Sequence, residues 1–346
     1  MRFNDQSTTN KLLLVLAIPL VFYILKELHF IFAPLMFAFF ISLLFIPMLR
    51  KLYKKGSPRI LALILVILII AGTFYGAVKL VSLTGKEILD GKEALYYKLD
   101  NKIGDLVMPY AEVLGIEPVK GKSAIKSILM SPQISERLYG NFGDTFMFFQ
   151  RTMVTLLMTL FFLVLILAGT FNFKLLMQES LLLRRTQTIK TYLAIERSIV
   201  KFLKVKFLMS FFTGLGFGLI AWGFGISFPL FWGVFAFAIN FVQMIGSVIV
   251  TVMAALFAFI ELESPGTILL VSLLFTGVQV LFGSVLEPFL MGKSFSINVI
   301  TVLVMLMFWS YLWGVSGLIL SIPITVLLKT LMEQYPTSRK LAVLMG

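Results

Sequence analysis

Residues 60–83 read ILALILVILIIAGTFYGAVKLVSL, and this stretch decides the class of fold. It contains one charged side chain, Lys79, and exceeds the roughly 20 apolar residues that carry a helix across a hydrocarbon core of about 30 Å. Because no water is present there to satisfy backbone N–H and C=O groups, a helix is the expected structure. Lys79 lies near one end of the stretch, where its ammonium group can extend toward the membrane surface.

Seven further apolar runs lie on either side of this stretch. The whole chain has the same character: 59% of its 346 residues are hydrophobic, 14% are charged, and the mean hydropathy is +0.97. A soluble domain carries about 25% charged residues. The sequence therefore predicts an all-α, polytopic transmembrane protein. The further runs are residues 12–25, 30–49, 146–171, 207–224, 228–260, 267–286 and 297–328.

The charged and reactive residues exclude several classes of function. The net charge is +13, but the basic residues fall between apolar runs, where they act as orientation signals rather than as a nucleic-acid surface. The absence of cysteine excludes disulfides, thiol catalysis and cysteine-bound metal. His29 is the single histidine, so no histidine metal cluster or Ser-His-Asp triad can form. We expect no enzyme activity, no metal and no cofactor.

The basic residues of the first loop fix the predicted orientation. Five of them lie between the second and third runs, a loop that the positive-inside rule places in the cytoplasm: Arg50, Lys51, Lys54, Lys55 and Arg59. The amino terminus is then cytoplasmic, and the first apolar run is a retained span because it has no small-residue cleavage site. The third run leads outward, so residues 84–145 form a small extracytoplasmic helical insert.

Residues 172–206 return to the cytoplasmic side and carry a basic amphipathic pattern. Apolar residues such as Ile199 and Leu203 recur at helical spacing, and Arg197 and Lys204 share another face. Such a helix can lie in the interface with its basic face toward anionic lipids. Alternatively, it is a solvated helix that packs on a neighbouring subunit.

These assignments divide the chain into five parts. We expect an N-terminal membrane region, the external insert, the fourth span with its cytoplasmic helix, a C-terminal transport region, and a cytoplasmic tail. Both termini are then cytoplasmic. The five parts are residues 1–83, 84–145, 146–206, 207–330 and 331–346.

Two runs of the C-terminal region, residues 228–260 and 297–328, are too long for one ordinary span, and each is interrupted near its middle. Asn240, Gln243 and Gly246 interrupt the first, and Gly314 and Gly317 interrupt the second. Each run is either a long tilted helix or a pair of half-helices that forms a re-entrant hairpin. The protein then has eight spans, or about six full spans plus two hairpins. Broken helices that meet at mid-membrane form the sites of many secondary transporters.

Short motifs of the second half resemble the carboxyl half of the autoinducer-2 exporter-like family of bacterial membrane proteins. They are LEPFLMGK at 286–293, WGVSG at 313–317 and SIP at 321–323. The resemblance implies a secondary transporter of the bacterial cytoplasmic (inner) membrane. Described substrates of the family range from the signal autoinducer-2 to sodium or lithium ions exchanged for protons. One position departs from the family pattern, because Gln243 stands where the family usually has a proline three residues before the glycine.

Glu287 is the carboxylate that most needs an explanation, because burying a charge at mid-membrane costs roughly 2.5 to 3.5 kcal/mol. A cation, a proton or Lys293 could compensate it, and Glu287 could couple ion movement to solute movement. Alternatively, it is an interfacial side chain that caps the turn at Pro288 and pairs with Lys293. Four amides, Asn240, Gln243, Gln279 and Asn298, suit a polar solute, although amides also hold membrane helices together.

The sequence thus favours a transporter or exporter that moves a small polar solute or a cation, such as Na⁺ or H⁺, by gradient-driven alternating access. We expect a homo-oligomer, because moving elements benefit from a fixed surround. The alternative is a non-transporting membrane scaffold that uses the external insert and the basic helix. The predicted pathway residues are Asn240, Gln243, Gly246, Gln279, Glu287, Pro288, Asn298, Gly314 and Gly317.

Overall fold

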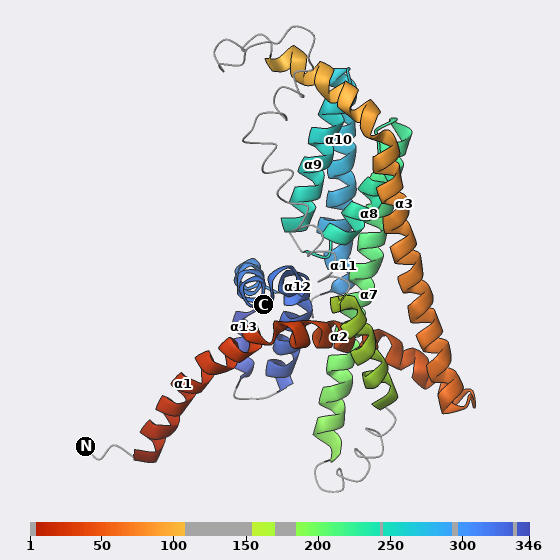
Figure 1. The fold of residues 1–346 in the computed structure, drawn as a ribbon. Coiled ribbons are helices and arrows are strands. Elements are labelled where there is room, and N and C mark those ends of the chain that lie inside the picture. The colour runs from red at the N-terminus through yellow and green to blue at the C-terminus, as the bar shows by residue number, and fades with distance from the viewer. Residues whose placement is uncertain (1–4, 108–153, 170–184, 243–244, 293–296, 335–337) are drawn as a thin grey trace. The chain divides into compact units, whose positions relative to one another are not determined.

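The computed structural model describes residues 5–107, 154–169, 185–242, 245–292, 297–334 and 338–346 (Figure 1). Every regular element within these ranges is a helix, which confirms the predicted all-helical class. Five helical stretches are long and apolar enough to cross a membrane: His29–Lys54, Ile60–Gly91, Leu193–Gly223, Pro265–Met291 and Val299–Gln334. Three shorter apolar helices are Val154–Gly169, Pro229–Ile239 and Ile245–Glu261. The total of six or eight full spans stays a prediction.

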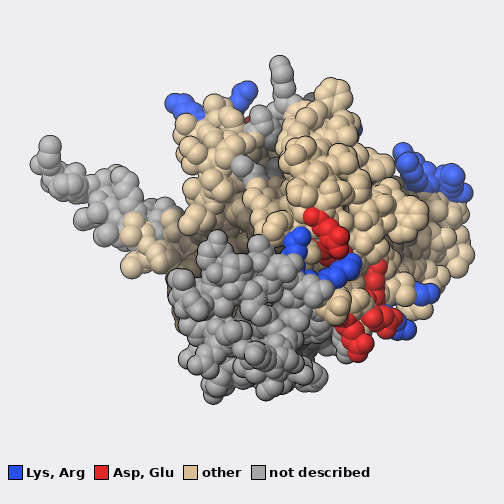
Figure 2. Space-filling view, turned by 90° about the horizontal axis from the view of Figure 1, so that it is seen from above, with Lys and Arg blue, Asp and Glu red and all other residues tan. Residues whose placement is uncertain are grey.

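The outward-facing side chains are those of a protein surrounded by lipid. In the stretch Ile60–Gly91, only 11% of the most apolar window is buried inside the protein. Ile60, Leu61 and Leu68 on this stretch are each 60% exposed or more. Soluble proteins rarely expose contiguous apolar patches of more than a few hundred Å². On the face seen in Figure 2, charged side chains stand in small groups and broad areas carry none.

The chain forms two compact units, and two long helices contribute to both of them. Unit 1 comprises Met1–Leu68, Thr152–Lys204 and Lys293–Gly346, and unit 2 comprises Ile69–Arg151 and Val205–Gly292. The shared helices are α3 (Arg59–Val107) and α7 (Arg185–Gly223).

Unit 1 is built on α12 (Val299–Gln334), which contacts α1 (Asp5–Glu27), α2 (His29–Lys54) and α13 (Arg339–Leu344). Aromatic residues of α12 hold the end of α1. Trp313 Nε1 donates a hydrogen bond to the carbonyl oxygen of Leu25 at 2.9 Å, and the Lys26 ammonium lies 4.1 Å from the centroid of the Tyr311 ring.

The first part of α7 has the amphipathic character that the sequence predicts. Ile199 and Phe202 are buried, whereas Arg197 and Lys204 are exposed. The Arg50 guanidinium of α2 binds the buried Glu196 carboxylate of α7 at 2.6 Å. Whether the basic face meets lipid at the cytoplasmic surface stays a prediction.

Both shared helices run through boundaries that the sequence pattern placed between elements. The predicted interfacial helix and fifth span are one continuous helix, α7, because no proline or glycine interrupts residues 185–213. In the same way α3 continues past residue 83 to Val107, since that segment contains no proline. The first part of the predicted insert is therefore one long helix, and residues 108–145 lie outside the described residues. The five predicted domains themselves stay predictions.

Unit 2 contains the later parts of α3 and α7 together with five consecutive elements. These are α8 (Pro229–Ile239), α9 (Ile245–Glu261), α10 (Pro265–Gln279), the π-helix η2 (Val280–Leu286) and α11 (Glu287–Met291). Figure 1 shows α9 and α10 side by side. Phe217 of α7 stacks on Phe275 of α10, with ring centroids 4.8 Å apart, at the centre of an apolar cluster.

Glycines let α7 and α8 approach closely. A Cβ atom on Gly214 would lie 2.6 Å from the carbonyl oxygen of Gly233, and one on Gly218 would lie 3.3 Å from that of Pro229. Gly214 and Gly218 thus form a helix-packing pair, as small residues four apart do in membrane helices.

Within unit 2, charged residues on one face of α3 fasten both ends of the α8–α9 pair. The Glu87 carboxylate accepts hydrogen bonds from the backbone N–H groups of Leu230 and Phe231, at 3.3 and 3.1 Å, in the first turn of α8. Lys98 pairs with Glu261 at 3.5 Å, and Lys102 donates to the carbonyl oxygen of Leu262 at 3.2 Å, both at the end of α9. An acidic group at a helix start and basic groups at a helix end match the helix dipoles.

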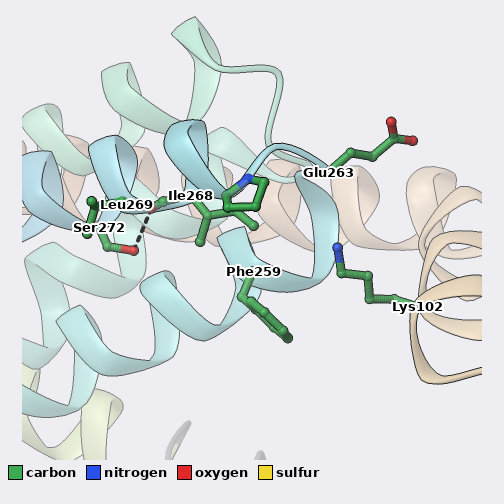
Figure 3. A pocket seen from close by; sticks show the side chains of 7 residues that line it. Lys102, Phe259, Glu263, Ile268, Leu269 and Ser272 are labelled. Atoms are coloured by element: carbon green, nitrogen blue, oxygen red, sulfur yellow. Dashed lines mark hydrogen bonds between the residues drawn. The ribbon is translucent and has the colours of Figure 1, made fainter. Parts of the chain in front are cut away.

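A largely apolar hollow of about 490 Å³ lies beside this end of α9 (Figure 3). Lys102 and Glu263 provide charged groups at its edge. The residues that line it are Lys102, Phe259, Glu263, Pro265, Ile268, Leu269 and Ser272.

Candidate functional site

The first predicted interruption is present in unit 2. α8 has 11 residues and α9 has 17, so each is shorter than the roughly 20 residues that a complete span needs. The two helices contact each other, and Gly246 lies so close to the carbonyl group of Ile239 that a Cβ atom there would overlap its oxygen. Glycine is therefore required where the second half-helix leaves the break.

The second interruption is present in unit 1, inside α12. Gly314 has φ 59° and ψ −135°, a backbone conformation that is open essentially to glycine alone. One turn later, a Cβ atom on Gly317 would overlap the carbonyl oxygen of Trp309. Both interruptions thus combine a break with a glycine packed against the carbonyl group of the preceding half-helix.

Buried amides and a hydroxyl group meet at the first interruption. Asn240 Nδ2 donates to Ser210 Oγ at 3.0 Å, and Asn240 Oδ1 accepts from Gln279 Nε2 at 3.3 Å. The exposed fractions of Asn240, Ser210 and Gln279 are 2%, 0% and 9%. These bonds connect the end of α8 to α7 on one side and to α10 on the other.

Two polar atoms next to these bonds have no hydrogen-bond partner among the described residues. They are Gln279 Oε1 and the hydroxyl oxygen of Thr213, which is fully buried. A buried polar group without a partner costs about 1–3 kcal/mol. Both atoms therefore have a hydrogen-bonding capacity that a polar ligand could use.

A buried ion pair continues the same set of polar residues. Lys206 Nζ of α7 lies 3.0 Å from both carboxylate oxygens of Glu287, the first residue of α11. Both side chains are 4% exposed. The predicted partner, Lys293, lies outside the described residues, and the ion pair that the structure shows is made with Lys206.

The polar residues line up on facing helices. Lys206, Ser210 and Thr213 share one face of α7, because residues four and seven apart lie above one another on a helix. Gln279 and Glu287 lie eight residues apart on the facing segment. Together with Asn240 these residues are called the polar row: Lys206, Ser210, Thr213, Asn240, Gln279 and Glu287.

The π-helix η2 lies between the two facing members of the polar row, Gln279 and Glu287. Within it, a Cβ atom on Gly283 would lie 2.7 Å from Gln279 Nε2, so glycine leaves room for this amide. π-helical turns are rare and are found frequently at functional sites. The irregular backbone therefore coincides with the polar row.

The chemistry of the polar row is that of binding. It offers neutral hydrogen-bond donors and acceptors beside one compensated charge, in a unit whose remaining core is aromatic and aliphatic. Such a set suits a small polar solute or a single positive charge.

The remaining predicted residues have different positions. Pro288 is exposed beside Glu287, and Gln243 lies outside the described residues. Asn298 is exposed, its Oδ1 accepts from the backbone N–H of Ile300 at 3.0 Å, and it thereby caps the start of α12. Gly314 and Gly317 belong to unit 1. The structure thus brings Asn240, Gln279 and Glu287 into one unit beside Gly246, and a pathway role for all nine residues stays a prediction.

Sequence reasoning missed Lys206, Ser210 and Thr213. In the sequence Lys206 ends a segment rich in basic residues and has the appearance of a surface charge. Its spacing carried a signal, because Lys206 follows Ile199 by seven residues and Phe202 by four, which places it on the buried face of the helix.

Comparison with known proteins places these features in a family. The model of the AI-2E family transporter matches residues 12–337, nearly the whole chain. The match includes both interruptions and every member of the polar row.

Individual relatives agree with the family match. The AI-2 transport protein TqsA of Escherichia coli K12 is 26% identical over an alignment of 353 positions, which covers 98% of this chain and 97% of TqsA. A candidate transport protein of Haemophilus influenzae is 24% identical over 324 residues, covering 91% and 90%. A candidate transport protein of Borreliella burgdorferi is 33% identical over 153 residues, and this match covers 44% of the chain and 42% of the relative.

Proposed function

Because the chain belongs to the AI-2E family of transporters, we propose that it is a secondary transporter driven by a gradient, which moves a small polar solute or a cation by alternating access. A role in membrane transport follows from the family together with the five helices long enough to span a bilayer. Its multi-pass character and its relatives make it a protein of the bacterial inner membrane.

The polar row is the observation that carries the proposal. Buried polar groups in membrane helices are costly, and they mark solute and ion pathways. Here they gather where α8 ends, at a break in a run that is otherwise apolar, and two of their atoms lack a partner among the described residues. Site formation at broken helices is the arrangement common to many secondary transporters.

Four members of the polar row have a proposed role. Asn240 and Gln279 bind the solute through their amide groups, with Ser210 as a further contact. Glu287 couples the movement of a cation or proton to the movement of the solute. The name of the E. coli relative supports an autoinducer-2-like signal as one candidate solute, and the alternative is Na⁺ or Li⁺ exchanged for H⁺.

The membrane arrangement is part of the proposal. The α8–α9 pair and α12 form two re-entrant hairpins, both termini are cytoplasmic, and the exposed basic residues of α7 face anionic lipid heads. Gly246 and Gly317, which pack against backbone carbonyl groups, support hairpins because they allow two half-helices to lie together. We expect several copies of the chain to assemble.

Flux measurements on reconstituted protein test the transport mechanism. Proteoliposomes are given sodium, lithium or proton gradients and small polar metabolites, and uptake is compared between the wild type and Gln279→Leu. The leucine removes the amide at the centre of the polar row and leaves the Asn240 oxygen without its donor. We expect a gradient-driven flux that Gln279→Leu lowers by at least about tenfold.

Thr276→Val is the matched control, since Thr276 lies on the same helix, is exposed, and bonds only to its own helix at Ser272. This variant should keep the wild-type flux. A flux that ignores every imposed gradient, or that is equal in Gln279→Leu and the wild type, would refute the proposed mechanism.

A further inference from the structure

Lys206 occupies the position at Glu287 that a transported cation would need. Its ammonium group lies 3.0 Å from both carboxylate oxygens, and both side chains are almost completely buried. An ammonium group so placed fills the site with one positive charge. The geometry of the pair therefore describes an occupied cation site whose occupant is tethered to the chain.

The Arg50–Glu196 pair of unit 1 shows that such burial is not general in this protein. There the basic side chain is 44% exposed and only the carboxylate is buried, so part of the guanidinium remains outside the protein core. In the Lys206–Glu287 pair, by contrast, the basic side chain is as deeply buried as the carboxylate. Removing either partner of such a pair is strongly destabilising, since it leaves an uncompensated charge in a medium of low dielectric constant.

The Lys206 side chain is long enough for its ammonium group to move away from Glu287. The side chain has four methylene groups and three donors, and it changes direction easily. The flexibility of this side chain allows the ammonium group to leave Glu287 when another cation replaces it there.

We propose that Lys206 is an internal counterion of Glu287, which compensates this carboxylate in the solute-free protein and is displaced when a monovalent cation binds there. The proposal rests on the transport function proposed above. A single positive charge is the class that fits, because the ammonium group that the cation replaces at Glu287 also carries one positive charge.

This role has a consequence for transport. With Lys206 in place, the empty site contains no bare charge, so the empty protein can change conformation and net transport can proceed. Without Lys206 the site is neutral only when a cation occupies it. A variant without the lysine should therefore keep cation exchange and lose net flux.

Thermal stability tests the proposal independently of transport. The variant Lys206→Gln removes the ammonium group and retains a polar side chain, and Tm is measured in NaCl, LiCl and choline chloride at equal ionic strength. We expect a loss on the order of 5 °C in choline chloride, because Glu287 is left uncompensated. Small cations should restore much of this loss, since a ligand that binds the folded state stabilises it.

Three controls isolate the effect. The wild type and Lys206→Arg should show a much smaller dependence of Tm on the cation than Lys206→Gln, because a cation must first displace the basic side chain. Lys204→Gln changes an exposed lysine of the same helix and should respond to the cation as the wild type does. The double variant Lys206→Gln/Glu287→Gln should be more stable than the single variant in choline chloride. Its Tm should not depend on the cation.

The outcome decides the proposal even if the single variant is unstable. In that case Lys206→Gln should be recovered as folded protein when it is solubilised in NaCl or LiCl and lost in choline chloride. A Tm of Lys206→Gln that does not depend on the cation would overturn the proposal. The proposal would also be overturned if Lys206→Gln is recovered as folded protein in none of the three salts while the double variant folds.

Flux separates this proposal from the transport proposal. In proteoliposomes, Lys206→Gln should exchange cation across the membrane at a rate within about twofold of the wild type and lose at least about tenfold in net uptake. If the wild type itself shows no gradient-driven flux, the transport mechanism fails, whereas the Tm result still reports on the site. If net uptake of Lys206→Gln equals that of the wild type, the counterion role fails and the transporter stands.

Discussion

The two interrupted segments of this protein have the same backbone feature at the break but different side chains around it. In both, a glycine packs against a carbonyl group of the preceding half-helix, Gly246 against Ile239 and Gly317 against Trp309. In unit 2 the break is surrounded by Asn240 and its hydrogen-bonded neighbours. In unit 1 the break follows Trp309 and Trp313, whose ring centroids lie 4.9 Å apart.

This difference shows that the interruption of a helix and the capacity to bind a solute depend on different residues. Glycines explain how each segment turns, and they are common to both breaks. Buried hydrogen-bonding groups explain what a break can bind. Unit 2 has the polar row with its two unpartnered atoms, whereas the buried hydroxyl groups that follow the break of α12, Ser321 and Thr325, bond to carbonyl oxygens of their own helix. We therefore propose that the α8–α9 break binds solute and that the break of α12 has a structural role.

Substitution of the packed glycines should have the largest effect, and it should be similar in the two breaks. Gly246→Ala and Gly317→Ala each place a Cβ atom against a backbone carbonyl oxygen that cannot move aside easily. We expect each to lose on the order of 3 kcal/mol of stability, measured by thermal unfolding in detergent.

Gly277→Ala is the control for both glycines, because nothing lies within 4 Å of a Cβ atom placed there. It should be neutral or stabilising by up to about 1 kcal/mol. If Gly246→Ala and Gly317→Ala are as well tolerated as this control, the two breaks are not held by close packing.

Side-chain substitution should then distinguish the breaks. Asn240→Leu leaves Ser210 Oγ and Gln279 Nε2 without their partner, and it should lower flux by at least about tenfold. Trp309→Phe at the other break removes an indole N–H that has no partner among the described residues, and it should change flux by less than about twofold. Equal losses of flux in the two variants would contradict the assignment of solute binding to unit 2.

A third variant tests the structural role of unit 1. Trp313→Phe removes the hydrogen bond to the carbonyl oxygen of Leu25 and should cost about 1 kcal/mol of stability. Because this bond holds the end of α1 within unit 1 and the polar row belongs to unit 2, the flux per folded molecule should stay at the wild-type level. A large loss of flux with unchanged Tm would show that the tryptophans of α12 take part in transport.

The smallest effect is expected where α3 holds the start of α8. Glu87→Gln keeps an acceptor for the N–H groups of Leu230 and Phe231 but removes the charge that favours this helix end. We expect a loss of about 0.5–1 kcal/mol at low salt, and less at high salt because the interaction is screened. Glu93→Gln, an exposed glutamate of the same helix, should show no such dependence.

Much of the fold could be predicted from the pattern of apolar residues. The apolar run at residues 60–83 predicted a helix long enough to cross a membrane. Single polar or small residues, Asn240 and Gly314, indicated where two later runs are interrupted. The continuous helices α3 and α7 could not be predicted as single elements. A change from apolar to amphipathic composition indicates a change of surroundings, and a helix can pass through that change without ending.

The candidate site was predicted only in part, for a related reason. Asn240, Gln279 and Glu287 stand out because each is polar in an apolar run. Lys206 does not, since a lysine at the end of a basic helix has the appearance of a surface charge. Its partner depends on how α7 packs against α10 and α11, and that packing is a tertiary feature that one sequence does not reveal.

Accessibility of the polar row to water tests the central claim most directly. The chain contains no cysteine, so a single introduced thiol reports on its own position. Ser210→Cys replaces a completely buried hydroxyl of the polar row, and Ala221→Cys adds a thiol on the same face of α7 within the apolar cluster. Labelling with a membrane-impermeant thiol reagent is measured in proteoliposomes under an imposed gradient.

If polar solute passes along the polar row, Ser210→Cys is labelled while the protein transports, saturating solute protects it, and Ala221→Cys stays unlabelled. If Ser210→Cys transports at the wild-type rate and is labelled no faster than Ala221→Cys, the solute takes another path and the assignment of the polar row is wrong.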